Sequence, residues 1–201
     1  MDTNIDNLQV LNESFYERDT SLVAKELLGK ILIRRTEGQD LGGFIVETEA
    51  YYGGTDPASH AFRGKTPRSK IMFGRAGIAY VYFCYGMYNL LNAATEKQDM
   101  PGAVLIRALE PVYGIEIMKK RRKTEVTGEL TNGPGKLTIS LGIDLNDNGK
   151  DLTSGTGDLY VAKVNFPIKY KKIGHSQRVG IKNGKEKFLR YFFEKCEFVS
   201  I

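Results

Sequence analysis

Residues 44–52 read FIVETEAYY, and we predict a strand over residues 42–51 that includes most of this stretch. Successive side chains of a strand point to opposite faces, so Glu47, Glu49 and Tyr51 share one face. Burying an ionised carboxylate is costly unless the group is hydrogen-bonded or paired. Two carboxylates on one face of an otherwise apolar strand therefore need an explanation.

Three explanations fit these residues. The carboxylates can form a functional site. They can instead lie at an exposed edge of the sheet, or pair with Arg34 or Arg35 across a hairpin. Arg107 interrupts another apolar strand, AVLIRALEP, and an arginine in that setting usually meets a carboxylate or a phosphate. A pairing of Arg107 with Glu47 or Glu49 therefore also fits.

Short elements surround the acidic strand. The predicted helices are 20–28, 114–123 and 134–143, and the predicted strands are 30–36, 42–51, 78–84, 88–94, 102–109, 158–165, 187–193 and 196–200. Residues 53–77 are predicted to form a long irregular loop. Strands and helices do not alternate regularly, which favours an α+β fold with a largely antiparallel sheet. We expect a single domain over residues 1–201.

Composition excludes several classes of protein. Hydrophobic residues make up 41% and charged residues 26% of the chain, as in ordinary globular domains. With two cysteines and two histidines, the chain lacks the ligands of a zinc finger or a zinc deaminase, and a disulfide scaffold is not expected. No apolar stretch is long enough to span a bilayer. The N-terminus does not resemble a secretory signal, so we expect a cytoplasmic protein, nucleoid-associated if prokaryotic, with no membrane partner.

The net charge of +5 is unevenly distributed. Residues 61–123 carry 12 basic and 4 acidic side chains, and residues 163–201 carry 10 basic and 3 acidic ones. If the fold joins these segments on one face, that face can neutralise a nucleic-acid backbone. The simpler alternative, which a run such as Lys119–Lys123 favours, is that the lysines only solubilise loops and helices.

Tyrosines gather in one part of the chain: six of the eleven lie between residues 51 and 88. Such rings can be core residues of strands, or they can stack on a planar base. Electron-rich rings attract a cationic base more strongly. The turn at residues 85–88 can project side chains as a wedge into a nucleic-acid groove.

These separate motifs together resemble the alkyladenine (3-methyladenine) DNA glycosylase family. In order along the chain, the matching segments are Ile45-Val46-Glu47-Thr48-Glu49-Ala50-Tyr51, His60, Thr66-Pro67-Arg68, Tyr80-Val81-Tyr82, Tyr85-Gly86-Met87-Tyr88, Arg107-Ala108-Leu109-Glu110-Pro111 and Gly133-Pro134 with Lys136-Leu137. Weaker matches follow at Arg178-Val179-Gly180 and Leu189-Arg190-Tyr191. The resemblance implies a single mixed domain with a curved, largely antiparallel sheet and flanking helices. It also implies an enzyme without metal or cofactor that acts on damaged double-stranded DNA.

The resemblance also implies roles for individual residues. Glu49 matches the general base that activates the attacking water, and Arg107 matches a residue beside that water. The residues that match the pocket for the flipped base are Tyr51, His60 and Tyr82, with Asn92 discriminating against guanine. Tyr85 and Met87 match the side chains that fill the hole left by the flipped nucleotide.

Basic residues near these motifs are candidates for contacts with the DNA backbone. They are Arg63, Arg68, Lys70 and Lys136. Lys136 follows a tight turn that feeds a helix N-terminus, where a phosphate can bind. We expect the enzyme to act as a monomer on alkylated or deaminated purines and to leave an abasic site.

The reaction predicted from this resemblance is hydrolysis alone. We expect no lysine beside the tyrosines, and therefore no Schiff base and no strand cleavage. Two alternatives remain: a non-catalytic module that binds damaged DNA or tRNA, and a hydrolase of free nucleosides. Glu49 argues against the module, because a carboxylate at the mouth of a polyanion site repels phosphates. The two basic segments argue against the hydrolase.

Overall fold

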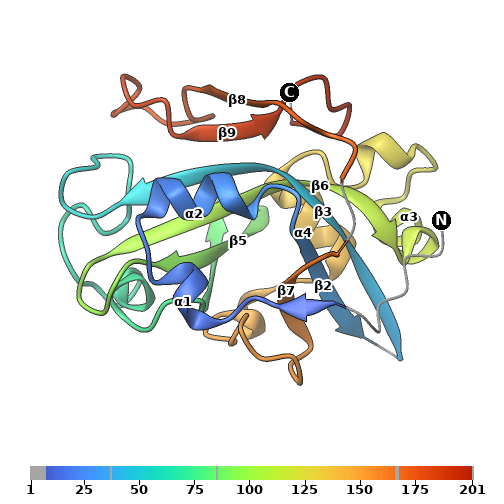
Figure 1. Cartoon of the computed structure of the whole chain (residues 1–201), viewed down its shortest axis with the longest axis horizontal. Helices are drawn as coiled ribbons and strands as arrows, with labels where there is room; N and C mark the ends of the chain where they lie inside the picture. The colour runs from blue at the N-terminus through green and yellow to red at the C-terminus, as the bar shows by residue number, and fades with distance from the viewer. Residues whose placement is uncertain (1–7, 37, 85, 166–167, 201) are drawn as a thin grey trace.

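The acidic stretch lies in the longest strand, β3 (Gln39–Tyr52), at the centre of the sheet (Figure 1). The computed structural model describes residues 8–36, 38–84, 86–165 and 168–200. The other strands in this part of the chain are β1 (Gln9–Val10), β2 (Ile31–Thr36), β4 (Ala79–Cys84), β5 (Tyr88–Thr95), β6 (Gly102–Tyr113), β7 (Leu159–Lys163), β8 (Ile173–Ser176) and β9 (Arg190–Phe193).

The sheet is antiparallel at every pairing between the described strands, in the order β1-β7-β2-β3-β6-β5-β4. Strand β6 pairs along most of β3. On the other edge of β3, β2 pairs with Gln39–Phe44, and β9 pairs with Glu47–Glu49. The register of β3 against β6 shifts around Glu47, which marks a bulge or irregularity. The predicted α+β fold with a largely antiparallel sheet is confirmed.

Helices cover parts of this sheet. They are α1 (Glu13–Tyr16), α2 (Thr20–Leu27), α3 (Ile115–Arg122) and α4 (Pro134–Leu141). Helix α2 begins where the Asp19 side chain accepts a hydrogen bond from the Leu22 N–H, and its buried face includes Val23 and Leu27. The Thr48 hydroxyl donates to the Ala24 carbonyl at 2.8 Å. The β3 face opposite the two glutamates therefore packs on α2.

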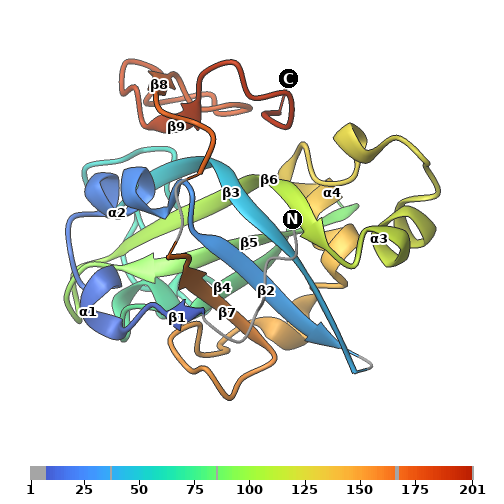
Figure 2. The same cartoon turned by 45° about the vertical axis from the view of Figure 1, so that its right-hand side comes forward.

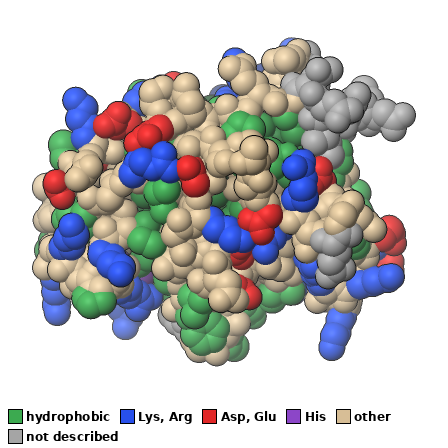
Figure 3. Space-filling model, turned by 90° about the horizontal axis from the view of Figure 1, so that it is seen from below, with side chains coloured by type: hydrophobic (Ala, Val, Ile, Leu, Met, Phe, Trp, Pro, Cys, Tyr) green, Lys and Arg blue, Asp and Glu red, His purple; other side chains and the backbone are tan. Residues whose placement is uncertain are grey.

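The C-terminal part of the chain, residues 168–200, lies along one side of the molecule, and we call it the C-terminal layer. Its strand β9 pairs with the edge of β3 that carries the acidic residues, and β8 pairs with β9 (Figure 2). The opposite, lower face of the molecule shows acidic and basic side chains interspersed (Figure 3). The net positive charge is therefore not concentrated on that lower face. None of the helices formed by the described residues has the length and apolar character needed to cross a bilayer.

Most predicted elements are present, but one is wrong. Residues 196–200 form turns and a bend instead of a strand. Lys195 has a left-handed backbone (φ 61°), which turns the chain out of β9, and Phe198 then packs in the core. Strands β1 and β8 and helix α1 were not predicted. Within the loop 53–77, Lys70–Phe73 form a single 3-10 turn.

Candidate active site

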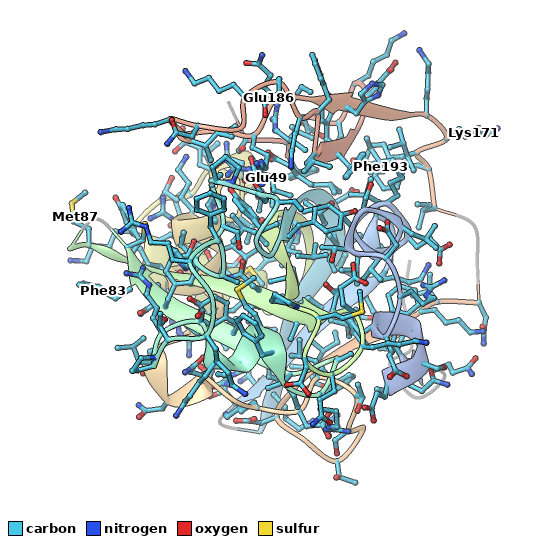
Figure 4. The ribbon with its side chains drawn as sticks, turned by 90° about the vertical axis from the view of Figure 1, so that its left-hand side faces the viewer. Glu49, Phe83, Met87, Lys171, Glu186 and Phe193 are labelled. Carbon is cyan, nitrogen blue, oxygen red and sulfur yellow. The ribbon has the colours of Figure 1, made fainter. Side chains whose placement is uncertain are left out.

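Glu49 lies in β3 beneath the C-terminal layer, with a fully buried side chain (Figure 4). Its Oε1 accepts the backbone N–H of Val179 at 2.7 Å, and its Oε2 accepts the Tyr51 hydroxyl at 2.8 Å. The Arg107 Nη1 stands 3.4 Å from the same Oε2. Burial, and secondarily the charge of Glu49, holds the pKa of Tyr51 well above its ordinary value. Tyr51 therefore keeps its proton and donates to the carboxylate.

Arg107 joins the two glutamates. Its Nε donates to Glu47 Oε1 at 2.7 Å, while its Nη1 faces Glu49. Burial alone would lower the pKa of Arg107, but the charges of Glu49 and Glu47 outweigh it and raise that pKa. The predicted pairing of Arg107 with the acidic strand is confirmed for both carboxylates.

The alternative pairing across the hairpin is wrong. Arg34 pairs with Asp147 at 2.5 Å, and Arg35 pairs with Asp40 at 3.0 Å. The alternative of an exposed edge is also wrong, because Glu47 and Glu49 are fully buried. Strand β9 pairs with β3 at these two residues, so this edge of β3 is not exposed.

A cavity of about 560 Å³ lies next to Glu49. Its lining brings together the predicted pocket residues Tyr51, His60 and Tyr82 with Arg107 and with Val179. Tyr51, Arg107 and Val179 also contact the Glu49 carboxylate. The carboxylate therefore lies directly behind this wall of the cavity.

Aromatic rings form another wall. The His60 and Tyr82 rings meet edge to face, with centroids 4.5 Å apart and planes at 75°. The His60 Nδ1 is hydrogen-bonded to the Tyr80 hydroxyl at 2.8 Å. The Arg68 guanidinium lies 5.1 Å from the centre of the Tyr82 ring. Such walls can hold a planar ring by stacking.

His60 is neutral at physiological pH. Its burial, with a smaller contribution from the charge of Arg68, lowers its pKa from 6.5 to about 4. A neutral imidazole does not repel a cationic base.

We therefore expect His60 to take up its proton far below the usual range in an NMR titration of the imidazole signals. The unfolded chain binds this proton more readily than the folded one, so His60 lowers the stability of the fold as the pH falls from 6.5 towards about 4. A His175→Gln variant leaves His60 as the chain's single histidine and assigns the signal. A midpoint near 6.5 for that signal would contradict the prediction.

Asn92 lies behind the main cavity. It is buried in β5, and its side-chain amide donates to the Tyr80 carbonyl at 3.0 Å. A second, small cavity of about 20 Å³ touches Asn92 together with Tyr51, His60 and Tyr82. Asn92 is thus fixed at the inner end of the aromatic wall, and it does not line the main cavity.

The hairpin of β4 and β5 carries exposed apolar side chains at its tip. Met87 is 66% exposed and Phe83 is 50% exposed, and both point away from the body of the molecule (Figure 4). Tyr85, the other predicted wedge residue, lies outside the described residues. The N-terminal turn of α4 packs against this hairpin, since a Cβ at Gly135 would stand 2.7 Å from the Tyr88 ring.

The predicted backbone contacts fall into two groups. Arg63, Arg68 and Lys70 are exposed on the loop after His60. Lys136 is half-buried, donates to the Asn132 side chain at 2.8 Å and lines the cavity, as does Lys182. The expectation that no lysine lies beside the tyrosines is therefore wrong. It failed because these lysines arrive from α4 and from the segment after Val179, both far from the tyrosines in sequence.

Sequence reasoning also missed a buried ion pair. The Asp56 carboxylate and the Arg178 guanidinium are both fully buried and make two hydrogen bonds, at 2.6 and 2.7 Å. The same guanidinium lies 4.5 Å from the centre of the Tyr51 ring. Its chain neighbour is Val179, whose N–H binds Glu49. The only signal in the sequence was the weak family match at residues 178–180.

No group of three or more His, Cys, Asp or Glu side chains that could hold a metal ion occurs among residues 8–36, 38–84, 86–165 and 168–200. What these residues do offer is a buried carboxylate, a guanidinium beside it and an aromatic chamber. Such a set can activate a water molecule and hold a planar, electron-poor group.

Known proteins are similar in sequence to this chain over nearly its full length. A family model described as Methylpurine-DNA glycosylase (MPG) matches residues 14–197. A protein of Carboxydothermus hydrogenoformans is 48% identical over 95% of this chain and 98% of its own. Relatives from Clostridium perfringens and Methanoculleus marisnigri are 44% and 43% identical, each over 94% of this chain and 98% of their own. All three carry the provisional name 3-methyladenine DNA glycosylase. The chain belongs to the methylpurine-DNA glycosylase family.

Proposed function

We propose that this glycosylase of base-excision repair flips an alkylated or deaminated purine out of duplex DNA into the aromatic cavity and hydrolyses its N-glycosidic bond. The observation that carries the proposal is the buried Glu49 carboxylate behind the wall formed by Tyr51, Arg107 and Val179. Its family membership makes the chain a DNA glycosylase; the lesion, the residue roles and the strictly hydrolytic outcome are our proposals.

The carboxylate has room for a water molecule. An ionised carboxylate offers about four lone-pair sites, and Glu49 uses two of them for the Val179 N–H and the Tyr51 hydroxyl, while Arg107 Nη1 stands 3.4 Å away as an ion-pair partner. A remaining site can accept a proton from a water molecule that enters from the cavity. As the N-glycosidic bond breaks and the base leaves with its electron pair, the negative charge of Glu49 stabilises the oxocarbenium-like sugar. The water oxygen then bonds to the anomeric carbon while its proton passes to Glu49.

The leaving group explains why one carboxylate suffices. A purine alkylated at N3 or N7 is cationic and departs as a neutral base, so no acid has to protonate it. The walls formed by Tyr51 and Tyr82 favour such a cation, and neutral His60 does not oppose it. Flipping requires about a few kcal/mol and is easiest for damaged or poorly paired bases.

The proposal is tested with duplexes that each carry one defined lesion: 3-methyladenine, 7-methylguanine, hypoxanthine or ethenoadenine. We expect abasic sites, detected as alkali-sensitive breaks, from at least the cationic lesions. Breaks without alkali, or a protein–DNA adduct trapped by borohydride through Lys136 or Lys182, would contradict simple hydrolysis. Tight lesion binding without any base release would favour the alternative, a non-catalytic binding module.

Met87 provides a prediction about flipping. Because Met87 projects from the hairpin tip, Met87→Ala should weaken binding of a lesion duplex by about tenfold, as the wedge that fills the vacated stack is lost. Met100→Ala is the matched control, since Met100 is 56% exposed but lies next to the start of β6, which pairs with the opposite end of β5. Equal affinities for the two variants would remove Met87 from the DNA interface.

A further inference from the structure

We propose that Glu47 and Ser200 are positioning residues of this reaction, which hold Arg107 so that only its Nη1 faces Glu49. The inference rests on the proposed function, because it concerns the same Glu49 carboxylate. Glu47 is a fully buried carboxylate that has no role in the mechanism described above. Ser200 reaches it from the C-terminal layer, 153 positions away in sequence.

Both oxygens of Glu47 are bound by donors of the protein. Its Oε1 accepts from Arg107 Nε at 2.7 Å, Arg190 Nε at 2.7 Å and the Ser200 hydroxyl at 2.8 Å, and its Oε2 accepts the Ser200 N–H at 2.7 Å. Of these partners Arg107 lines the cavity, whereas Arg190 and Ser200 do not. Glu49 differs, because Tyr51, Val179 and Arg107, which contact it, all line the cavity.

The same contacts fix the Arg107 fork. Its Nε is held by Glu47, and its Nη2 donates to the Ser200 hydroxyl at 3.0 Å. The remaining Nη1 stands 3.4 Å from Glu49 Oε2, longer than the usual 2.7–2.9 Å of a charged hydrogen bond. Arginine prefers to bind a carboxylate through two parallel N–H groups. Held by Glu47 and Ser200, Arg107 cannot close on Glu49 in that way.

These contacts of Arg107 keep the general base, Glu49, available to water. A bidentate pair with Arg107 would occupy the Glu49 lone pair that the attacking water needs. The Ser200 hydroxyl is the link between both partners, because it donates to Glu47 and accepts from Arg107. Ser200 is itself held in place, since Arg190 Nη2 donates to its carbonyl at 2.9 Å.

Ser200→Ala tests the proposal with minimal change in volume. We expect the single-turnover rate constant of base release to fall about tenfold, because Arg107 is no longer held away from Glu49. Affinity for a duplex with a tetrahydrofuran abasic-site analogue should stay within about twofold, since Ser200 does not line the cavity. Ser200→Thr keeps the hydroxyl and should restore most of the rate.

Ser176→Ala is the matched control. The Ser176 hydroxyl accepts a hydrogen bond from the same Arg190, at 3.2 Å. Among the described residues it binds neither Glu47 nor Arg107, so loss of this hydroxyl should leave the rate of base release unchanged. In an Arg107→Lys background, Ser200→Ala should change the rate less than about twofold, because the fork is already gone. The proposal is overturned if Ser200→Ala releases bases at the wild-type rate, or if it loses release rate and duplex affinity by the same factor. It is also overturned if Ser200→Ala lowers the release rate in the Arg107→Lys background by as much as it does in the wild type. Absence of base release by the unmodified protein would instead count against the proposed function.

Discussion

Glu49→Gln is expected to slow base release by about a thousandfold while lesion binding changes little. An amide cannot take a proton from water, and general-base catalysis typically contributes about 10²–10⁴ in rate. The walls formed by Tyr51, His60 and Tyr82 are untouched by this change, so the cavity should still hold the flipped base. Single-turnover kinetics measures release, and the equilibrium affinity for a duplex with a stable lesion analogue measures binding.

The matched control for this change is Glu186→Gln. Glu186 is exposed on the C-terminal segment above Glu49 (Figure 4). The Glu186→Gln variant should therefore keep the normal rate of base release and the normal affinity for the lesion duplex. If Glu49→Gln lowers release and binding by the same factor, Glu49 is structural. If the Glu49→Gln variant releases nucleobases at the normal rate, Glu49 is not the general base.

Arg178→Ala is expected to lower the free energy of unfolding by about 3–5 kcal/mol, the usual effect of leaving one member of a buried ion pair without its partner. Among the described residues, the Asp56 carboxylate would keep the hydrogen bonds from the Tyr52 and Ala58 N–H groups. The measurement is urea unfolding at pH 7, with Lys172→Ala as control. Lys172 pairs with Glu194 at 2.9 Å but its side chain is 77% exposed, so about 0–1 kcal/mol is expected.

The same pair predicts how stability depends on pH. Burial alone would raise the pKa of Asp56, but the hydrogen bonds and charge of Arg178 outweigh it, so the pKa lies below its ordinary value of 3.8. The stabilisation is therefore complete above pH 3.8 and is lost as the pH falls through the lower, folded-state pKa. An Arg178→Ala variant with normal stability at pH 7 would contradict this account.

The fold could be predicted where local pattern decides it. Alternation placed Glu47 and Glu49 on one face of β3, and the helix from Thr20 lies where its sequence predicts. The alternating pattern of residues 196–200 predicted a strand, and that prediction was wrong. The left-handed turn at Lys195 depends on the packing of the C-terminal layer, which alternation does not indicate.

The site could be predicted only in part, for a similar reason. The aromatic residues and Arg107 belong to recognisable motifs, and the structure brings Tyr51, His60, Tyr82 and Arg107 to one cavity. Val179 contributes a backbone N–H, which any residue except proline would supply, so its identity carries no signal. Asp56 and Ser200 lie in irregular segments, where neither periodicity nor spacing marks a buried partner.

The divided edge of β3 has a consequence for how the protein is made. The ribosome delivers the acidic strand early, yet three of the residues that donate hydrogen bonds to it come 130, 143 and 153 positions later, namely Val179, Arg190 and Ser200. Pairings so distant in the chain form slowly. A nascent chain that ends before these residues therefore lacks three of the residues that donate to the two glutamates, and it gains a competent centre only when its last stretch docks.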